Sequence, residues 1–183
     1  VAILAVVAWA FFCWAVRKIG RQSRAWTWAA VLVLPAVVAM VLWPEPALVS
    51  HGMLEVTAID VGQGDSILVV GPDGRTMLVD AGGPVGGLTE AAEATSRFDV
   101  GEEVVSPYLW SRRFRRLDVL ALSHAHSDHM GGMPAVMRNF RPRELWVSID
   151  PDSEAYRALL VEAKELGVVV RHFYAGDRVA WDR

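Results

Sequence analysis

Cysteine is almost absent from this sequence. The single Cys13 lies in the first apolar segment, so the chain cannot form a disulfide-stapled scaffold or a closed thiolate metal site. Internal repeats and low-complexity tracts are absent as well, which excludes solenoid and fibrous architectures. Cysteine usage does not fix the compartment, which we therefore infer from membrane topology.

Charged residues are nearly absent from the first 43 residues. Two apolar runs, Ala2 to Val16 and Ala25 to Trp43, approach the roughly 20 residues that a membrane-spanning helix needs. Tryptophans near the ends of the second run fit the headgroup boundary. We expect two transmembrane helices, the first completed by residues upstream of Val1, and a buried soluble hairpin is the alternative.

The short loop between the two runs contains cations and no anion, namely Arg17, Lys18, Arg21 and Arg24. Such loops stay on the cytoplasmic side of a membrane. The second helix then runs outward, and the following residues lie on the far face of the cell inner (cytoplasmic) membrane. We therefore predict a multi-pass membrane part over residues 1–46 and an extracytoplasmic domain over residues 47–183.

The second part has the composition and patterning of a soluble α/β domain. Alternating and apolar runs predict strands at residues 54–60, 66–70, 76–79, 117–122, 144–148 and 168–171. Helices are expected over parts of residues 100–113, 134–140 and 153–166, with a flexible loop at 84–96 and a last strand opening at Gly176 and Asp177. This order predicts a layered sandwich with a mixed sheet.

Three of the five histidines fall within six positions directly after the predicted strand at 117–122. In extended backbone, residues two apart point to the same side, so His124 and His126 can hold one metal ion. Asp128 and His129 follow as the chain turns. Imidazole and carboxylate ligands suit zinc, manganese or iron, and the absence of thiolates argues for an open, reactive site. A histidine-rich turn without an ion is the alternative.

Four ligands so close together predict two divalent transition metal ions, zinc or manganese. A pair of such ions activates water and stabilises the attacking and leaving oxygens of a phosphoryl transfer. We interpret His51 and His172 as ordinary surface or boundary histidines, because neither has comparable neighbours.

The run from His124 to His129, followed by Gly131 and Gly132, resembles the signature of the metallo-β-lactamase superfamily. Residues 79–83 resemble an earlier motif of that superfamily, and the resemblance implies that Asp80 supports the metal ligands. An Asx-type turn is the alternative for Asp80. The resemblance implies an αβ/βα sandwich, of which this chain would be the first half.

Residues 59–66 and 117–124 resemble, more narrowly, the C-terminal domain of ComEC-type competence proteins, which are inner-membrane channels for DNA uptake. The resemblance implies a metal-dependent nuclease in natural transformation, with DNA, the lipid bilayer and other competence-machinery proteins as partners. It gives Asp60, Gln63 and Asp65 a place near the metals, although turn chemistry explains the glycines among them equally well.

The later ligands of the superfamily, a histidine, a bridging aspartate and a final histidine, have no counterpart before Arg183. We therefore expect these 183 residues to be part of a longer protein and to be inactive alone. Rival functions are a membrane-tethered hydrolase of an ester or lactam and a transport component that only docks DNA.

Nucleic-acid binding has local support only, because the net charge is -3. Two groups of arginines flank the motif in sequence and could track phosphates, although a solvated face is the commoner meaning. Trp110 and Phe114 could stack on bases, although core packing is the alternative. The arginines are Arg112, Arg113, Arg115, Arg116, Arg138, Arg141 and Arg143.

Overall fold

A computed structural model of the chain describes residues 45–83 and 98–179 without a break, together with scattered positions before residue 45. The chain divides into two compact units, Val1–Glu45 and Pro46–Arg183.

The two predicted membrane helices lie largely outside the described residues. Within the part of the chain that is described, no helix is both long enough and apolar enough to cross a bilayer.

The second unit is built on one mixed sheet of six strands in the order of the sequence. β1, β2 and β3 form an antiparallel meander, and β3 to β6 run parallel. The strands are β1 Glu55–Ala58, β2 Ile67–Val70, β3 Thr76–Val79, β4 Val119–Ala121, β5 Glu144–Val147 and β6 Val169–His172. This is the mixed α/β sheet that the sequence predicts.

A row of leucines forms the centre of the core. Leu68 lies beside Leu78, Leu78 beside Leu120, and Leu120 beside Leu145 on adjacent strands. All four side chains are fully buried. Burying a leucine contributes roughly 2 kcal/mol, so this row fixes both the register of the strands and the face that the helices cover.

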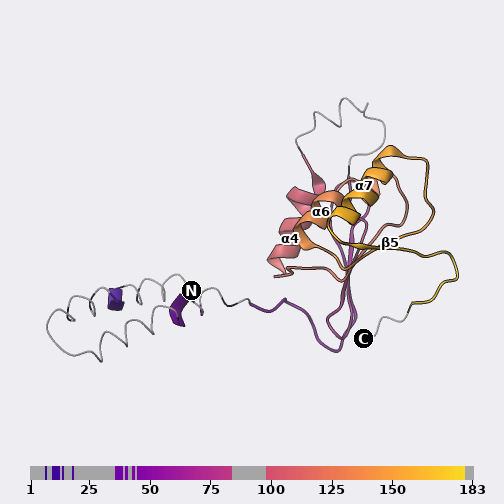
Figure 1. Cartoon of the computed structure of the whole chain (residues 1–183). Helices are drawn as coiled ribbons and strands as arrows, with labels where there is room; N and C mark the ends of the chain where they lie inside the picture. The colour runs from indigo at the N-terminus through magenta and orange to yellow at the C-terminus, as the bar shows by residue number, and fades with distance from the viewer. Residues whose placement is uncertain are drawn as a thin grey trace. The chain divides into compact units, whose positions relative to one another are not determined.

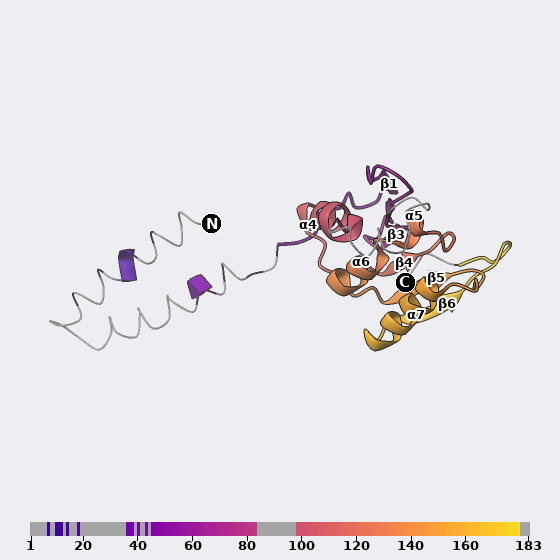
Figure 2. The same cartoon turned by 90° about the horizontal axis from the view of Figure 1, so that it is seen from above.

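The longer helices all cover the leucine face of the sheet (Figures 1 and 2). In α6, the residues Met133, Val136, Met137 and Phe140 recur with the helical period and are buried. In α7, Ser153 caps the first turn by accepting a hydrogen bond from the backbone N–H of Tyr156. The helical segments are the π-helix η1 Gly101–Val105 and the α-helices α4 Ser106–Ser111, α5 Ser127–Met130, α6 Met133–Phe140 and α7 Glu154–Glu165.

The opposite face of the sheet is apolar and partly exposed. Strand alternation places Ile67, Val69, Met77, Val79 and Trp146 on this face. No helix among the described residues covers it. The described residues thus show one sheet with one helical layer.

The predicted final strand at Gly176 and Asp177 was wrong for the described residues. The backbone N–H of Asp177 donates to the carbonyl of Tyr174, and the Asp177 carboxylate accepts from the N–H of Tyr174, so these residues close a turn. Aspartate favours such turns over a strand. The loop predicted at residues 84–96 lies outside the described residues.

The two ends of the sheet carry different loops. The motif end comprises residues 59–66, 80–83, 123–132 and 148–153, which follow β1, β3, β4 and β5. The linker end comprises residues 46–54, 71–75, 112–118 and 141–143, which precede the same strands or join β2 to β3. A strand rises about 3.3 Å per residue, so the two ends lie on the order of 20 Å apart.

An ion pair fastens the start of β1 to the segment after α4. The Arg112 guanidinium donates to both oxygens of Glu55, at 2.6 and 3.0 Å, and these side chains are only about a quarter exposed or less. Hydrogen bonding to Arg112 holds the pKa of Glu55 below its ordinary value of 4.5. The bidentate geometry is the strong form of a charge-assisted pair.

We expect Glu55→Gln to lower the free energy of unfolding by about 1–2 kcal/mol at neutral pH, because Arg112 loses its carboxylate partner. Since the folded-state pKa of Glu55 is depressed, this stability is present above pH 4.5 and is lost as the pH falls through the folded-state value. Denaturant unfolding at several pH values measures it. Asp152→Asn, which breaks an exposed pair with Arg157, is the control and should change stability by less than about 0.5 kcal/mol. Equal effects of the two substitutions would contradict the assignment.

Candidate metal centre

The histidine motif lies at the motif end, where β4 leads into α5. His126 is the extended residue before α5, and His129 lies within this short helix. The ring centroids of His124 and His126 are 4.6 Å apart, and those of His124 and His129 are 3.9 Å apart. The structure thus brings the three predicted histidine ligands into one cluster.

Asp80 directly follows β3 and lies beside this cluster. Its side chain is buried, and its φ of 56° is in the left-handed region, which aspartate tolerates better than most residues. The carboxylate accepts hydrogen bonds from the backbone N–H of Ser123 at 2.8 Å and from the Ser123 hydroxyl at 2.5 Å. It also lies 2.8 Å from Nδ1 of His129. Asp80 therefore joins the ends of β3 and β4 to α5.

These contacts determine which ring nitrogens carry hydrogen. An ionised carboxylate only accepts hydrogen bonds, so the hydrogen between His129 and Asp80 is on Nδ1 of His129. The Ser123 hydroxyl gives its hydrogen to Asp80 and accepts from Nδ1 of His124, 3.0 Å away. In its neutral form, each of these histidines then has its lone pair on Nε2, which is the form that binds a metal ion.

The carboxylates of Asp128 and Asp65 lie near His129. Nε2 of His129 is 3.7 Å from Oδ2 of Asp128, and Nδ1 is 3.9 Å from Oδ2 of Asp65. Two ligands of one tetrahedral ion, each about 2.1 Å from it, lie about 3.4 Å apart. The distance between Nε2 of His129 and Oδ2 of Asp128 is therefore close to the distance between two ligands of one ion.

Among the described residues, no three histidine, cysteine, aspartate or glutamate side chains are disposed to hold one ion as they stand. What fits a metal is the chemistry of the donors, the ring orientation that Asp80 and Ser123 fix, and the spacing of one ligand pair.

The loop between β1 and β2 separates the roles of its polar residues. Asp60 accepts a hydrogen bond from the backbone N–H of Gly62 and so closes its own turn, with its side chain exposed. Gln63 is exposed and its N–H bonds to the carbonyl of Val61. Only Asp65 brings a carboxylate near a histidine of the motif.

Glycines allow the loops of the motif end to touch backbone to backbone. A Cβ on Gly64 would lie 1.7 Å from the carbonyl oxygen of Asp128, and one on Gly83 would lie 2.0 Å from that of Ser127. A Cβ on Gly132 would lie 2.3 Å from the carbonyl oxygen of Ala81. Side chains at these positions would push the histidine motif away from the loops that follow β1 and β3.

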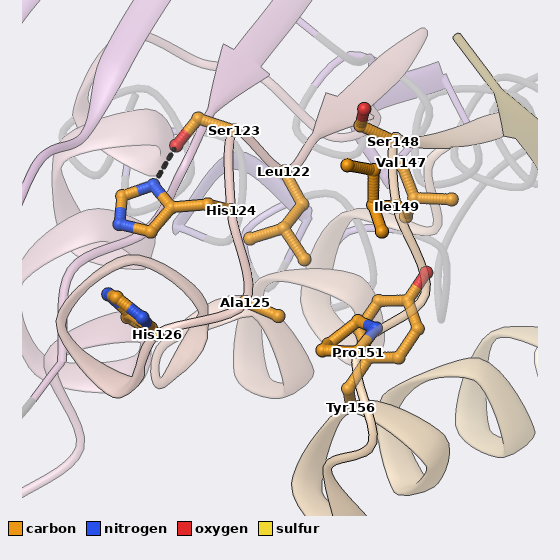
Figure 3. A pocket seen from close by; sticks show the side chains of 10 residues that line it. All are labelled: Leu122, Ser123, His124, Ala125, His126, Val147, Ser148, Ile149, Pro151 and Tyr156. Atoms are coloured by element: carbon orange, nitrogen blue, oxygen red, sulfur yellow. Dashed lines mark hydrogen bonds between the residues drawn. The ribbon is translucent and has the colours of Figure 1, made fainter. Parts of the chain in front are cut away.

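A pocket of about 250 Å³ adjoins the motif between the ends of β4 and β5 (Figure 3). His124 and His126 lie on one side of it, and Val147, Ser148, Ile149, Pro151 and Tyr156 lie on the other. Most of the wall is apolar. A substrate group held here would lie directly beside the histidine cluster.

A family model described as "Metallo-beta-lactamase superfamily" matches residues 59–182. The chain belongs to this superfamily. It is 34% identical over 147 residues to "ComE operon protein 3" of Bacillus subtilis (strain 168), which covers 76% of this chain and 18% of that protein. It is 38% identical over 117 residues to "Competence protein ComA" of Neisseria gonorrhoeae, covering 64% of this chain and 14% of that protein.

Among solved structures, the chain is similar to MEM-A1, a subclass B3 metallo-beta-lactamase isolated from a soil metagenome library. The TM-score is 0.34 and the identity 17%, over 58% of this chain and 34% of that one. The chain thus spans less than one fifth of the curated relatives that it matches.

A polar cluster beside the superfamily motif was not predicted. The Tyr156 hydroxyl donates to Asp150 at 2.6 Å, and Nε2 of His172 lies 2.9 Å from the same oxygen. Burial, and then the bond to Asp150, raises the pKa of Tyr156, while the bonds from Tyr156 and then His172 lower that of Asp150. The spacing of the three residues in the sequence follows no motif, so only the fold reveals the cluster.

The arginines predicted to track phosphates lie away from the superfamily motif. Arg112, Arg113, Arg115, Arg116, Arg141 and Arg143 are on the linker end, and Arg138 is on α6. Arg112 is bound to Glu55, and Arg138 to Glu162. The six arginines at the linker end are too far away to contact a phosphate at the histidine cluster. Phe114 is buried in the core, whereas Trp110 is 47% exposed.

We expect Asp80→Asn to weaken metal binding by about 10–100-fold, because an amide can donate to Nδ1 of His129 and shift the ring hydrogen to Nε2. Asparagine tolerates a positive φ as well as aspartate does, so the backbone is kept. Calorimetric titration with Zn²⁺ or Mn²⁺ measures the affinity, and imidazole nitrogen chemical shifts report the tautomer without metal. Asp60→Asn makes the same chemical change in an exposed turn and should leave both readouts unchanged. An unaltered His129 tautomer in Asp80→Asn would disprove the role of Asp80.

A second pair of substitutions tests the close approach of Gly64. Gly62 and Gly64 have φ of +79° and +81°, but only Gly64 faces another backbone, since nothing lies within 4 Å of a Cβ on Gly62. We expect Gly62→Ala to cost about 1–2 kcal/mol of stability through backbone strain. Gly64→Ala should cost at least about 1 kcal/mol more and alter the imidazole resonances of residues 124–129. Equal losses of stability for Gly62→Ala and Gly64→Ala in denaturant unfolding would show that the loop between β1 and β2 does not contact the loop after β4.

Proposed function

We propose that the protein takes part in DNA uptake as a multi-pass protein of the inner membrane, with an extracytoplasmic domain that hydrolyses phosphodiesters using two divalent ions, zinc or manganese. The homology to ComE operon protein 3 and to ComA, both named for competence, supports this role. The bilayer, DNA and other competence-machinery proteins are the partners it implies. The proposal concerns the full-length protein, because the matched relatives are much longer than this chain.

The single observation that carries the proposal is the hydrogen-bonded chain from His124 through Ser123 and Asp80 to His129. It orients two imidazoles in one cluster with the nitrogen chemistry that a metal ion requires. His124, His126, Asp128 and His129 would hold the ions, with Asp80 as the positioning residue and Asp65 beside them. When bound, two such ions supply an activated water and positive charge for phosphoryl transfer.

The charges at the motif end support a need for cations. The described residues 59–66, 80–83, 123–132 and 148–153 contain no lysine or arginine but contain six aspartates, namely Asp60, Asp65, Asp80, Asp128, Asp150 and Asp152. A phosphodiester, which is an anion, would be repelled by this surface. Bound divalent ions reverse the local charge. Phosphodiester binding at this end should therefore depend on metal ions.

Two rival functions remain distinct from this proposal. A membrane-tethered hydrolase of the same superfamily could act on an ester or lactam, and the apolar pocket beside His124 suits such a substrate. A transport component could instead use the domain only to dock DNA, with a structural metal. Assaying the full-length protein with a panel of phosphodiester, lactone, thioester and lactam substrates distinguishes the ester or lactam hydrolase from the proposed nuclease.

We expect His126→Ala in the full-length protein to reduce metal-dependent cleavage of DNA by at least about 1,000-fold, because the cluster loses one ligand. His51→Ala removes an exposed histidine at the linker end and is the matched control, with unchanged cleavage expected. Gel assays with labelled DNA, run with and without added Mn²⁺ or Zn²⁺, give the rates. Full activity of His126→Ala would rule out the proposed role of the motif.

Removal of the metal separates a nuclease from a docking component. For the nuclease, chelation should abolish both cleavage and DNA binding at the motif end, and added metal should restore them. If DNA binding persists after chelation and no cleavage is ever seen, while thermal stability falls, the domain only docks DNA.

A further inference from the structure

Positive charge in the second unit is concentrated at the linker end, opposite the metal motif. The acidic residues at this end are Asp73 and Asp118, and Glu45, Glu55 and Glu144 adjoin it. The basic residues are Arg75, Arg112, Arg113, Arg115, Arg116, Arg141 and Arg143. The excess of arginine gives this end a field that attracts anions.

Backbone pairing places the two arginine segments side by side. The N–H of Leu117 donates to the carbonyl of Phe140, and the N–H of Arg143 donates to the carbonyl of Leu117. Arg115 and Arg116 thus lie next to Arg141 and Arg143 at the start of β4 and β5. We call these four residues, all of which are exposed, the arginine patch.

The patch is not needed to hold the fold together. Arg112 binds Glu55, whereas Arg143, with 72% of its side chain exposed, is only within 3.5 Å of Asp118. Nε of Arg141 donates to the carbonyl of Arg138, an exposed contact. The charges of the patch face solvent, where they can meet a ligand.

The chain joins the second unit at the same end. Arg112 bonds Leu48 twice, through its backbone carbonyl at 2.9 Å and through its guanidinium at 2.7 Å. The N–H of Gly52 also donates to the carbonyl of Pro72. Pro46, where this unit begins, is two residues before Leu48 and so is covalently tied to the linker end. Any residues before it must leave from there.

Exposed apolar side chains lie at or beside the same end of the sheet as the patch. Trp110 is 47% exposed, and its ring centroid lies 5.7 Å from that of Phe140. Phe140 directly precedes Arg141 in the sequence. Leu48 is 46% and Met53 is 62% exposed. Cationic side chains mixed with tryptophan and aliphatic residues match a surface that lies in the headgroup region of a bilayer. Phosphates of a nucleic acid would give the aliphatic residues no partner.

We propose that the linker end, with its arginine patch, binds the anionic phospholipids of the membrane to which the chain is attached. This inference rests on the membrane attachment in the proposed function. It holds the motif end away from the bilayer, so that substrate reaches the histidine cluster from the aqueous side. Each arginine near an anionic surface strengthens binding by roughly fivefold.

Energy transfer from single labels to headgroup-labelled lipid tests this orientation. In the whole chain with Cys13→Ala, donors are placed at Ser111→Cys, the last residue of α4 directly before the linker end, or at Ala175→Cys beyond β6. The vesicles contain phosphatidylcholine alone or with added phosphatidylglycerol. We expect transfer from position 111 to exceed that from 175, to rise with phosphatidylglycerol, and to fall at high salt. Equal transfer at both positions, or no effect of the anionic lipid, would overturn the proposal.

The double variant Arg115→Gln with Arg116→Gln should lose most of the phosphatidylglycerol effect, a change of roughly 25-fold in affinity. Arg157→Gln with Arg178→Gln makes the same change of net charge elsewhere and should keep the effect. If labelled single-stranded DNA binds vesicle-bound chain in an Arg115- and Arg116-dependent way while the lipid effect is absent, the patch serves nucleic acid and the proposal fails.

Flotation separates this inference from the proposed function. A chain that floats with phosphatidylcholine vesicles but shows no lipid-dependent orientation keeps its membrane attachment and loses the inference. A chain that floats only with phosphatidylglycerol supports the lipid-binding patch and contradicts the attachment. Cleavage by the full-length protein, measured separately, does not depend on either result.

Discussion

The buried carboxylate of Asp80 is the constraint on which the candidate centre depends. It accepts three hydrogen bonds, two from Ser123 and one from His129, and so joins the ends of two parallel strands to the short helix that follows. A carboxylate in such a buried position is stable only when its oxygens are hydrogen-bonded. The need to satisfy Asp80 and the need to orient the histidines are therefore met by the same contacts.

Glycine contacts give this network its rigidity. Gly64, Gly83 and Gly132 each meet a carbonyl of another loop so closely that no side chain fits between. The loops after β1, β3 and β4 thus lock together around the histidines without filling the space above them. Rigid backbone on three sides and an open pocket on the fourth are what a preorganised site requires.

Much of the fold could be predicted because each element has a strong local signal. The continuous apolar run before His124 predicts a strand buried on both faces, and β4 is that strand, with Leu120 fully buried. The roles of Asp60 and Asp65 could not be distinguished in this way, since both lie within two residues of a glycine. Only the packing of Gly64 on Asp128 turns Asp65 toward His129 and leaves Asp60 in its own turn. The hydrogen bonds of Ser123 to Asp80 and His124 could not be predicted either, because a serine beside a histidine follows no recognisable sequence pattern.

The positions of the arginines follow from topology more than from composition. In parallel strands, residues before each strand and residues after it lie at opposite ends of the sheet. Arg115 and Arg116 precede β4 and the histidines follow it, so a few residues of strand separate the basic and acidic ends. Among the described residues 59–66, 80–83, 123–132 and 148–153, which lie around the histidines, there is no arginine or lysine to attract an anionic substrate. For the proposed phosphodiester substrate, these residues can supply positive charge only through the cations that the histidines and Asp128 would hold, so binding of substrate and binding of metal are physically one problem.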